Sequence, residues 1–257
     1  YWQNKLLPLG VPLAKFIAQD LHGQFSPFPA LLMKYIPGND ICNLYNDLSA
    51  TTKQNLAKQL VNIHAKTAAL PIGSSFGFAN SYEEPTNYKS WYDFLLARLA
   101  LCDESLKKTT AFAPDTVSKV LEISDNIRTN FSDVLPQPFM WDTSERNVII
   151  NNDQIAAIVD VDDMCFGDPL FVLGLTYVAL ESLGFDTIYC DTWAKLLELD
   201  QKAQLRLDFY RLFYTTWFMR HHADVVSDNG TAYNLNADIL NKIFQEATIK
   251  VKSLQHG

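Results

Sequence analysis

Three polar side chains within one stretch of the chain have types and a spacing that suit phosphoryl transfer. The stretch is Phe139–Pro169, and it places Asp142, Asn147 and Asp160 beside short apolar runs. One carboxylate can orient an attacking hydroxyl group and accept its proton, while an amide oxygen and a second carboxylate can hold Mg²⁺ against nucleotide phosphates. We therefore expect Asp142 to be the catalytic base, and Asn147 and Asp160 to be Mg²⁺ ligands.

The pattern around these residues predicts a β-hairpin. A β-branched run, Val148–Ile150, is followed by an Asn-Asn-Asp turn and by a second apolar run, Ile155–Val161. Such a hairpin brings the residues that precede and follow it to neighbouring loops. Asp162 and Asp163 follow the second run directly and are secondary candidates: one would support the metal, and the other would be a solvated acid of the loop.

The same stretch resembles the aminoglycoside phosphotransferase/choline kinase family. The spacing D-x-x-x-x-N from Asp142 to Asn147 is a weak signal alone, but V-D-x-D-D and G-D-P follow it after the hairpin. The resemblance implies an α+β, protein-kinase-like fold, in which 1–36 are the remnant of a nucleotide-binding small lobe with its hinge and 37–257 are a helical catalytic lobe. It also implies ATP and Mg²⁺ as cofactors and a small-molecule hydroxyl substrate that is an aminoglycoside, choline-like or sugar-like.

The chain departs from the family pattern at three positions. Met140 stands where the family has a His, Trp141 stands where Gly is usual, and Val172 stands where an Asp often follows G-D-P. In related enzymes that His supports the loop and does not accept the proton, so the three chemical residues remain. We interpret Asp168 of G-D-P as structural, because it can cap the helix that follows.

Two strands near the N-terminus are expected to form the hinge. They are Leu13–Asp20 and Ala30–Tyr35, and a Pro-Gly pair ends the second. Within the resemblance, Met33 would be the gatekeeper side chain. The backbone C=O of Lys34 and the N–H of Ile36 would hydrogen-bond the edge of adenine.

Ahead of these strands, a kinase-like small lobe needs a Gly-rich loop over the phosphates and a strand Lys paired with a helix Glu. The sequence contains neither, and Gly73–Gly77 does not qualify because it follows a helix. We expect the sequence to be an N-terminally truncated kinase that does not turn over ATP alone. The alternative is a catalytically inactive, pseudokinase-like module that binds a small molecule or a protein. The upstream coding sequence would discriminate between them.

Charge and composition narrow the partners and the compartment. The net charge of −8 argues against nucleic acid, which requires a basic surface. No apolar run reaches the roughly 20 residues needed to span a bilayer, no signal peptide opens the chain, and the four cysteines form no pair with metal-site spacing. We therefore expect a cytoplasmic protein without a membrane partner. An acidic cleft would suit a cationic substrate, with five candidate carboxylates: Glu145, Glu181, Asp186, Asp191 and Asp224.

Apolar periodicity predicts helices over 51–69, 88–107, 114–130, 170–183, 205–222 and 236–254. We expect His64, beside an apolar stripe, to be a core residue. The 205–222 helix carries an aromatic stripe, which we interpret as core in preference to a substrate wall: Tyr210, Phe213, Tyr214, Trp217 and Phe218. His221, His222 and Asp224 do not predict a metal site, because adjacent residues on a helix point in different directions.

Overall fold

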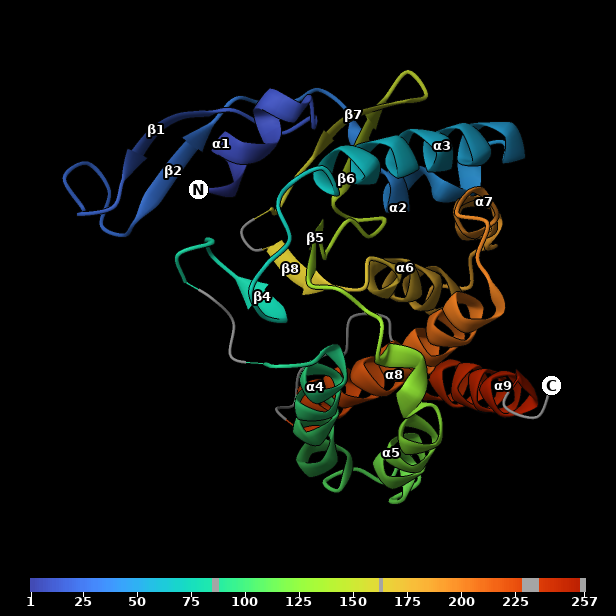
Figure 1. The fold of residues 1–257 in the computed structure, drawn as a ribbon. Coiled ribbons are helices and arrows are strands. Elements are labelled where there is room, and N and C mark those ends of the chain that lie inside the picture. The colour runs from blue at the N-terminus through green and yellow to red at the C-terminus, as the bar shows by residue number, and fades with distance from the viewer. Residues whose placement is uncertain (85–87, 162–163, 228–235, 255–257) are drawn as a thin grey trace.

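A computed structural model describes residues 1–84, 88–161, 164–227 and 236–254. These residues form an α+β protein in which helices surround short antiparallel sheets (Figure 1). The helices are α1 (Trp2–Leu6), α2 (Ile41–Leu44), α3 (Ala50–Thr67), α4 (Trp91–Leu106), α5 (Thr116–Asn126), α6 (Leu170–Ser182), α7 (Ile188–Leu196), α8 (Gln201–Ser227) and α9 (Ala237–Leu254). The strands are β1 (Phe16–Asp20), β2 (Ala30–Met33), β3 (Asn39–Asp40), β4 (Gly77–Ala79), β5 (Gln137–Met140), β6 (Val148–Asn151), β7 (Gln154–Ile158) and β8 (Met164–Gly167).

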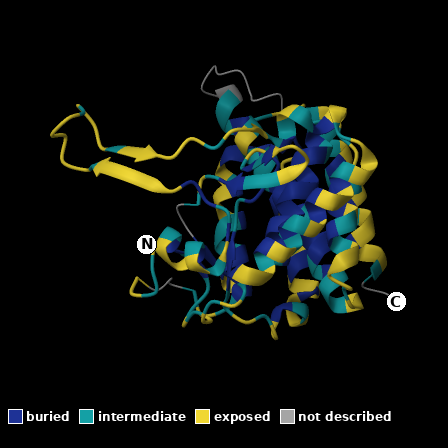
Figure 2. Cartoon of the chain, turned by 90° about the horizontal axis from the view of Figure 1, so that it is seen from above, coloured by how far each residue is buried: buried dark blue, intermediate teal, exposed yellow. Residues whose placement is uncertain are grey.

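Strands β1 and β2 form a two-stranded antiparallel ribbon that projects from the helical body (Figures 1 and 2). Both expected strands are present but shorter than predicted. Leu13, expected at the start of the first strand, instead forms a parallel bridge with Ile158 of β7. The ribbon exposes large apolar side chains, and Phe25 at its tip is 93% exposed.

The expected hairpin is present as β6 and β7, and it pairs on its other side with β3. Val148 pairs with Ile158, and Asn39 pairs with Ile150. Gly38, just before β3, has φ of 142°, and a Cβ there would lie 2.4 Å from the carbonyl oxygen of Ile150. Only glycine therefore lets the chain after the hinge approach the hairpin so closely.

Residues 164–167 correct the sequence interpretation. No strand is predicted after Val161 in this stretch, but the segment is strand β8, at the centre of the sheet β4-β8-β5. All four of its residues are buried. Gly167 lies against Trp91, and a Cβ at this glycine would be 2.1 Å from the indole ring. The segment is too short, and buried on too many sides, to show the alternation that identifies a strand.

The helical body packs around α6, whose residues are buried on almost every side. Helix α8 packs on α6, α9 and α4, and α3 packs on α7 and the β6–β7 hairpin. The predicted helices are confirmed with shifted ends; the one expected over 205–222 runs from Gln201 to Ser227. Among the described residues, no helix combines the length and apolar character needed to cross a bilayer.

Asp168 lies at the N-terminal end of α6 and connects this helix to α8. Its Oδ1 accepts a hydrogen bond from the N–H of Leu170 at 3.1 Å, at the start of the helix. Its Oδ2 accepts from Arg206 Nε at 2.7 Å and from the Tyr210 hydroxyl at 2.8 Å. Both carboxylate oxygens of this buried residue are used in packing, which agrees with the structural interpretation of G-D-P.

Candidate functional site

Asp142 lies in a loop, 141–147, that is closed by its own hydrogen bonds. Ser144 donates its hydroxyl to Asp142 Oδ1 at 2.7 Å. The side-chain amide of Asn147 donates to the carbonyl oxygen of Asp142 at 3.0 Å, and the Asn147 N–H donates to the carbonyl of Ser144 at 3.1 Å. The carboxylate of Asp142 is therefore held in place although the side chain is only half-buried.

Helix α3 also holds this loop, through His64. The His64 Nε2 lies 2.9 Å from the hydroxyl of the buried Thr143, and its ring stacks on Trp193 with centroids 5.1 Å apart. Burial lowers the pKa of His64 to about 4, so the ring is neutral at physiological pH. The expectation that His64 only fills the core missed this contact, because Thr143 is 79 residues away in sequence.

Met140, which replaces the family His, is buried at the end of β5 and pairs with Met164 of β8. It contributes an apolar side chain to the core beneath the loop. Val172, the other departure, is fully buried in α6. Both positions are packed by apolar residues, so neither side chain can supply the polar contact that the family residue would provide.

Asn147 and Asp160 are placed at the same end of the hairpin. The N–H of Val159 donates to the carbonyl of Asn147 at 2.9 Å, which extends the β6–β7 pairing by one residue. Asp160 follows directly, is exposed, and has a left-handed φ of 58°. An amide oxygen and a carboxylate fit Mg²⁺, which usually takes only one or two protein ligands and completes its shell with water and phosphate oxygens.

The described residues offer no further candidate site for a metal ion. Asp162 and Asp163 lie outside the described residues. Within the described ranges, no group of three or more His, Cys, Asp or Glu side chains could hold a metal ion.

The hinge residues lie at the base of the β1–β2 ribbon. Met33 is 48% exposed, and the N–H of Lys34 donates to the carbonyl of Lys15 at 2.8 Å. Within the part of the chain that the structure describes, the Lys34 C=O and the Ile36 N–H enter no backbone hydrogen bond. These two groups are the ones expected to contact adenine.

The hinge and the hairpin are also connected directly. The N–H of Ile158 donates to the carbonyl of Pro12 at 2.7 Å, beside the bridge between Ile158 and Leu13. The segment that leads into β1 therefore runs along β7, two residues before Asp160. This pairing connects the segment that leads into the expected adenine-binding hinge with the end of the hairpin that is expected to bind Mg²⁺.

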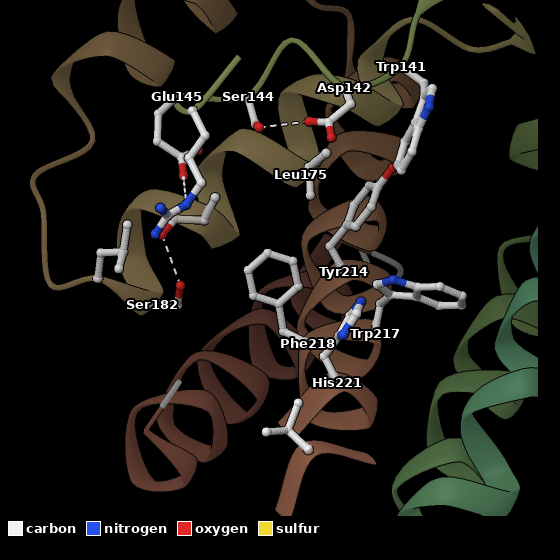
Figure 3. Close-up of a pocket in the computed structure, with 14 residues that line it drawn as sticks. Trp141, Asp142, Ser144, Glu145, Leu175, Ser182, Tyr214, Trp217, Phe218 and His221 are labelled. Carbon is white, nitrogen blue, oxygen red and sulfur yellow. Dashed lines mark hydrogen bonds and ion pairs between the residues drawn. The ribbon is translucent and has the colours of Figure 1, made fainter. Parts of the chain in front are cut away.

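A pocket of about 360 Å³ opens beside Asp142 (Figure 3). It lies between the loop at 141–146, one face of α6 and one face of α8. The aromatic stripe on α8 divides at this point: Tyr214, Trp217 and Phe218 line the pocket, whereas Tyr210 and Phe213 are buried in the core. The core interpretation therefore holds for Tyr210, Phe213 and Tyr214, which is 2% exposed, whereas Trp217 and Phe218 are only partly buried and line the pocket.

The five acids expected in a cationic cleft are not gathered there. Only Glu145 lines the pocket, and burial raises its pKa to about 7. The other four have partners elsewhere: Glu181 with Arg211, Asp186 with Lys53 at 2.6 Å, Asp191 with Tyr177 at 2.8 Å, and Asp224 with Arg220 at 3.3 Å.

Comparison with known proteins identifies a family for this chain and solved structures that resemble it. Residues 2–204 match the model of the phosphotransferase enzyme family. No relative was found among curated proteins. A thermostable mutant of aminoglycoside phosphotransferase APH(4)-Ia, in a ternary complex with AMP-PNP and hygromycin B, is 17% identical, with a TM-score of 0.55 over 96% of this chain and 77% of that one.

Two further solved structures have the same fold. The gentamicin complex of APH(2")-IIa is 18% identical, with a TM-score of 0.59 over 96% of this chain and 78% of that one. A putative fructosamine-3-kinase from Thermobifida fusca is 16% identical, with a TM-score of 0.58 over 97% of this chain and 80% of that one. The α+β arrangement described above is thus the fold of these small-molecule kinases.

Proposed function

Because the chain belongs to the phosphotransferase enzyme family, we propose that it transfers the γ-phosphoryl group of ATP to a hydroxyl group of a small molecule. The observation that carries this proposal is the placement of Asp142. Its loop-held carboxylate lies at the edge of a pocket large enough for a small molecule. Asn147 of the same loop and Asp160 lie together at the end of the hairpin.

Asp142 acts on the acceptor. Ser144 holds one carboxylate oxygen, and Figure 3 shows the other directed into the pocket. This free oxygen orients the acceptor hydroxyl group and takes its proton as the hydroxyl oxygen bonds to the γ-phosphorus. The bond from that phosphorus to the bridging oxygen breaks, and ADP leaves with the electron pair.

Asn147 and Asp160 hold Mg²⁺, which when bound neutralises charge on the nucleotide phosphates. Met33, Lys34 and Ile36 hold the adenine end, and this role is supported by the Lys34 C=O and the Ile36 N–H, which make no backbone hydrogen bond within the described residues. The AMP-PNP complex of APH(4)-Ia supports ATP as the donor. The division into 1–36 and 37–257 stays a prediction.

A second candidate function is the inactive binding module. The observation that favours it is Met140, because an apolar residue buried at the end of β5 cannot replace the polar support of a His. The contact between His64 and Thr143 weakens this alternative, since it supplies a different polar support for the same loop.

Transfer from [γ-³²P]ATP tests the proposal, with the complete translation product and a panel of aminoglycosides, choline and sugar derivatives. Asp142→Asn keeps the shape and removes the charge, so kcat is expected to fall by roughly 10²- to 10⁴-fold while nucleotide affinity stays constant. Asp153→Asn, in the exposed hairpin turn, is the matched control. Wild-type kcat in Asp142→Asn refutes the role of Asp142. Nucleotide or acceptor binding without any transfer supports the binding module.

A further inference from the structure

This inference rests on the proposed function and concerns the acceptor. We propose that the pocket beside Asp142 selects an uncharged alcohol that carries an apolar ring, and that it discriminates against polycationic acceptors. The proposal is based on the side chains that line the pocket and on the charged groups next to them.

The walls of the pocket are mainly apolar. Helix α6 contributes Leu175 and Ala179, Leu183 follows directly after it, and α8 contributes Tyr214 and Phe218 on the opposite side (Figure 3). Apolar surface that enters such a space gains about 25 cal/mol per Å² removed from water. An ammonium group loses its hydration there and requires a carboxylate in return. A volume of about 360 Å³ suits a ligand with a ring and a few hydroxyl groups.

Trp217 is the wall residue most suited to bind a cation, but two cations of the protein already lie against it. The guanidinium of Arg98 is 4.3 Å from its ring centroid, and that of Arg220 is 4.7 Å away. Within the described residues, Arg98 has no carboxylate within ion-pair distance, and burial lowers its pKa. These two positive charges beside the Trp217 ring oppose a third cation against the same ring.

Two carboxylates at or near the pocket already lie within ion-pair distance of an arginine. Glu145 lies 3.7 Å from Arg146, and Asp224 pairs with Arg220. Among the described residues that line the pocket, the carboxylates are Asp142, whose role is to bind the reacting hydroxyl group, and Glu145, whose Oε1 already lies beside Arg146. A polycation would need several free carboxylates.

Glu145 adds one feature that favours a polyhydroxyl ligand. Its Oε2 is buried and has no hydrogen-bond partner within the described residues. The side chain is 2% exposed and lines the pocket. A buried acceptor without a partner costs free energy, and a second hydroxyl group on the ligand would satisfy it. A ring-bearing sugar derivative combines all the required groups.

Titration calorimetry with the full-length protein, in the absence of nucleotide, measures the affinity for each probe and so tests the selectivity. The probes are phenyl β-D-glucopyranoside, methyl β-D-glucopyranoside, kanamycin A and choline. The phenyl glucoside is expected to bind at least roughly tenfold more tightly than the methyl glucoside, because its ring is buried against the apolar walls. It should also bind more tightly than kanamycin and choline.

A charge variant supplies the converse test. Val225→Glu adds a carboxylate to the wall on α8 and is expected to raise kanamycin affinity by roughly tenfold at low salt. The matched control is Ile249→Glu, on the exposed face of α9, which should leave kanamycin affinity unchanged. An equal rise in both variants contradicts a role for the pocket.

Two outcomes overturn the inference outright. Tighter binding of kanamycin or choline than of the phenyl glucoside does so, and so does equal affinity for the two glucosides, including the absence of binding by either. The test is separate from that of the proposed function. Selective binding without any phosphoryl transfer refutes only the function, whereas efficient transfer to kanamycin refutes only the selectivity.

Discussion

The contact between His64 and Thr143 predicts a specific loss of stability in acid. Burial lowers the pKa of His64 to about 4, from an ordinary value of 6.5. Its Nδ1 is buried and has no hydrogen-bond partner among the described residues, and its Nε2 lies 2.9 Å from the Thr143 hydroxyl. Between pH 6.5 and pH 4 the unfolded chain therefore binds a proton at this residue that the folded protein does not. Stability contributed by the neutral ring is lost as the pH falls through this window.

The size of the effect follows from the difference between the two pKa values. A difference of about 2.5 units corresponds to about 3 kcal/mol at its limit, and to about 2 kcal/mol between pH 7 and pH 5. Part of the His64 side chain reaches the surface, so these figures are upper values. Carboxylates also titrate in this range, and the comparison must therefore be made between variants.

His64→Gln is the informative perturbation, because the amide can still hydrogen-bond Thr143 but does not titrate. Urea unfolding followed by tryptophan fluorescence at pH 7, 6 and 5 should show that the variant loses about 1–2 kcal/mol less stability than the wild type. His22→Gln, at an exposed position, is the matched control and should follow the wild-type profile. Parallel profiles for wild type and His64→Gln would refute the reasoning.

Three further predictions concern the metal, an ion pair and a glycine. Asp160→Ala should weaken Mg²⁺-dependent binding of an ATP analogue by roughly tenfold or more in calorimetry, and unchanged Mg²⁺ dependence would exclude Asp160 as a ligand. Arg206→Met leaves the buried Asp168 without its cation and should cost about 3 kcal/mol in the urea unfolding assay, whereas a loss below about 1 kcal/mol would contradict the importance of this pair. Gly167→Ala forces a methyl group against Trp91 and should lower stability by about 1–3 kcal/mol, a result that an unchanged Tm would contradict.

Much of the fold was predictable from local patterns. Apolar periodicity identified the long helices, since a helix that buries one face repeats its apolar residues every three to four positions. The β-branched run and the Asn-Asn-Asp turn identified β6 and β7, whose register brings Asn147 and Asp160 together. The spacing from Asp142 to Asn147 is also local, because one short loop contains both residues.

The rest depends on contacts between distant segments. The β4-β8-β5 sheet joins residues near 78, 139 and 165, and none of these short strands shows alternation. The hydrogen bond from His64 to Thr143 and the pocket between α6 and α8 both arise from helix packing. A stripe of aromatic residues looks the same whether it faces a core or a cavity, so no signal in the sequence shows that Trp217 and Phe218 are only partly buried and line the pocket.

The projecting β1–β2 ribbon has a consequence for the colloidal behaviour of the protein. Apolar side chains cover it, and among the described residues each strand has one edge without a strand partner. Such an edge is a template for pairing with another molecule. Self-association through these edges would occupy the segment that carries Met33 and Lys34, which is expected to bind adenine. Apparent nucleotide affinity should therefore fall as protein concentration rises, while acceptor binding beside α8 stays constant.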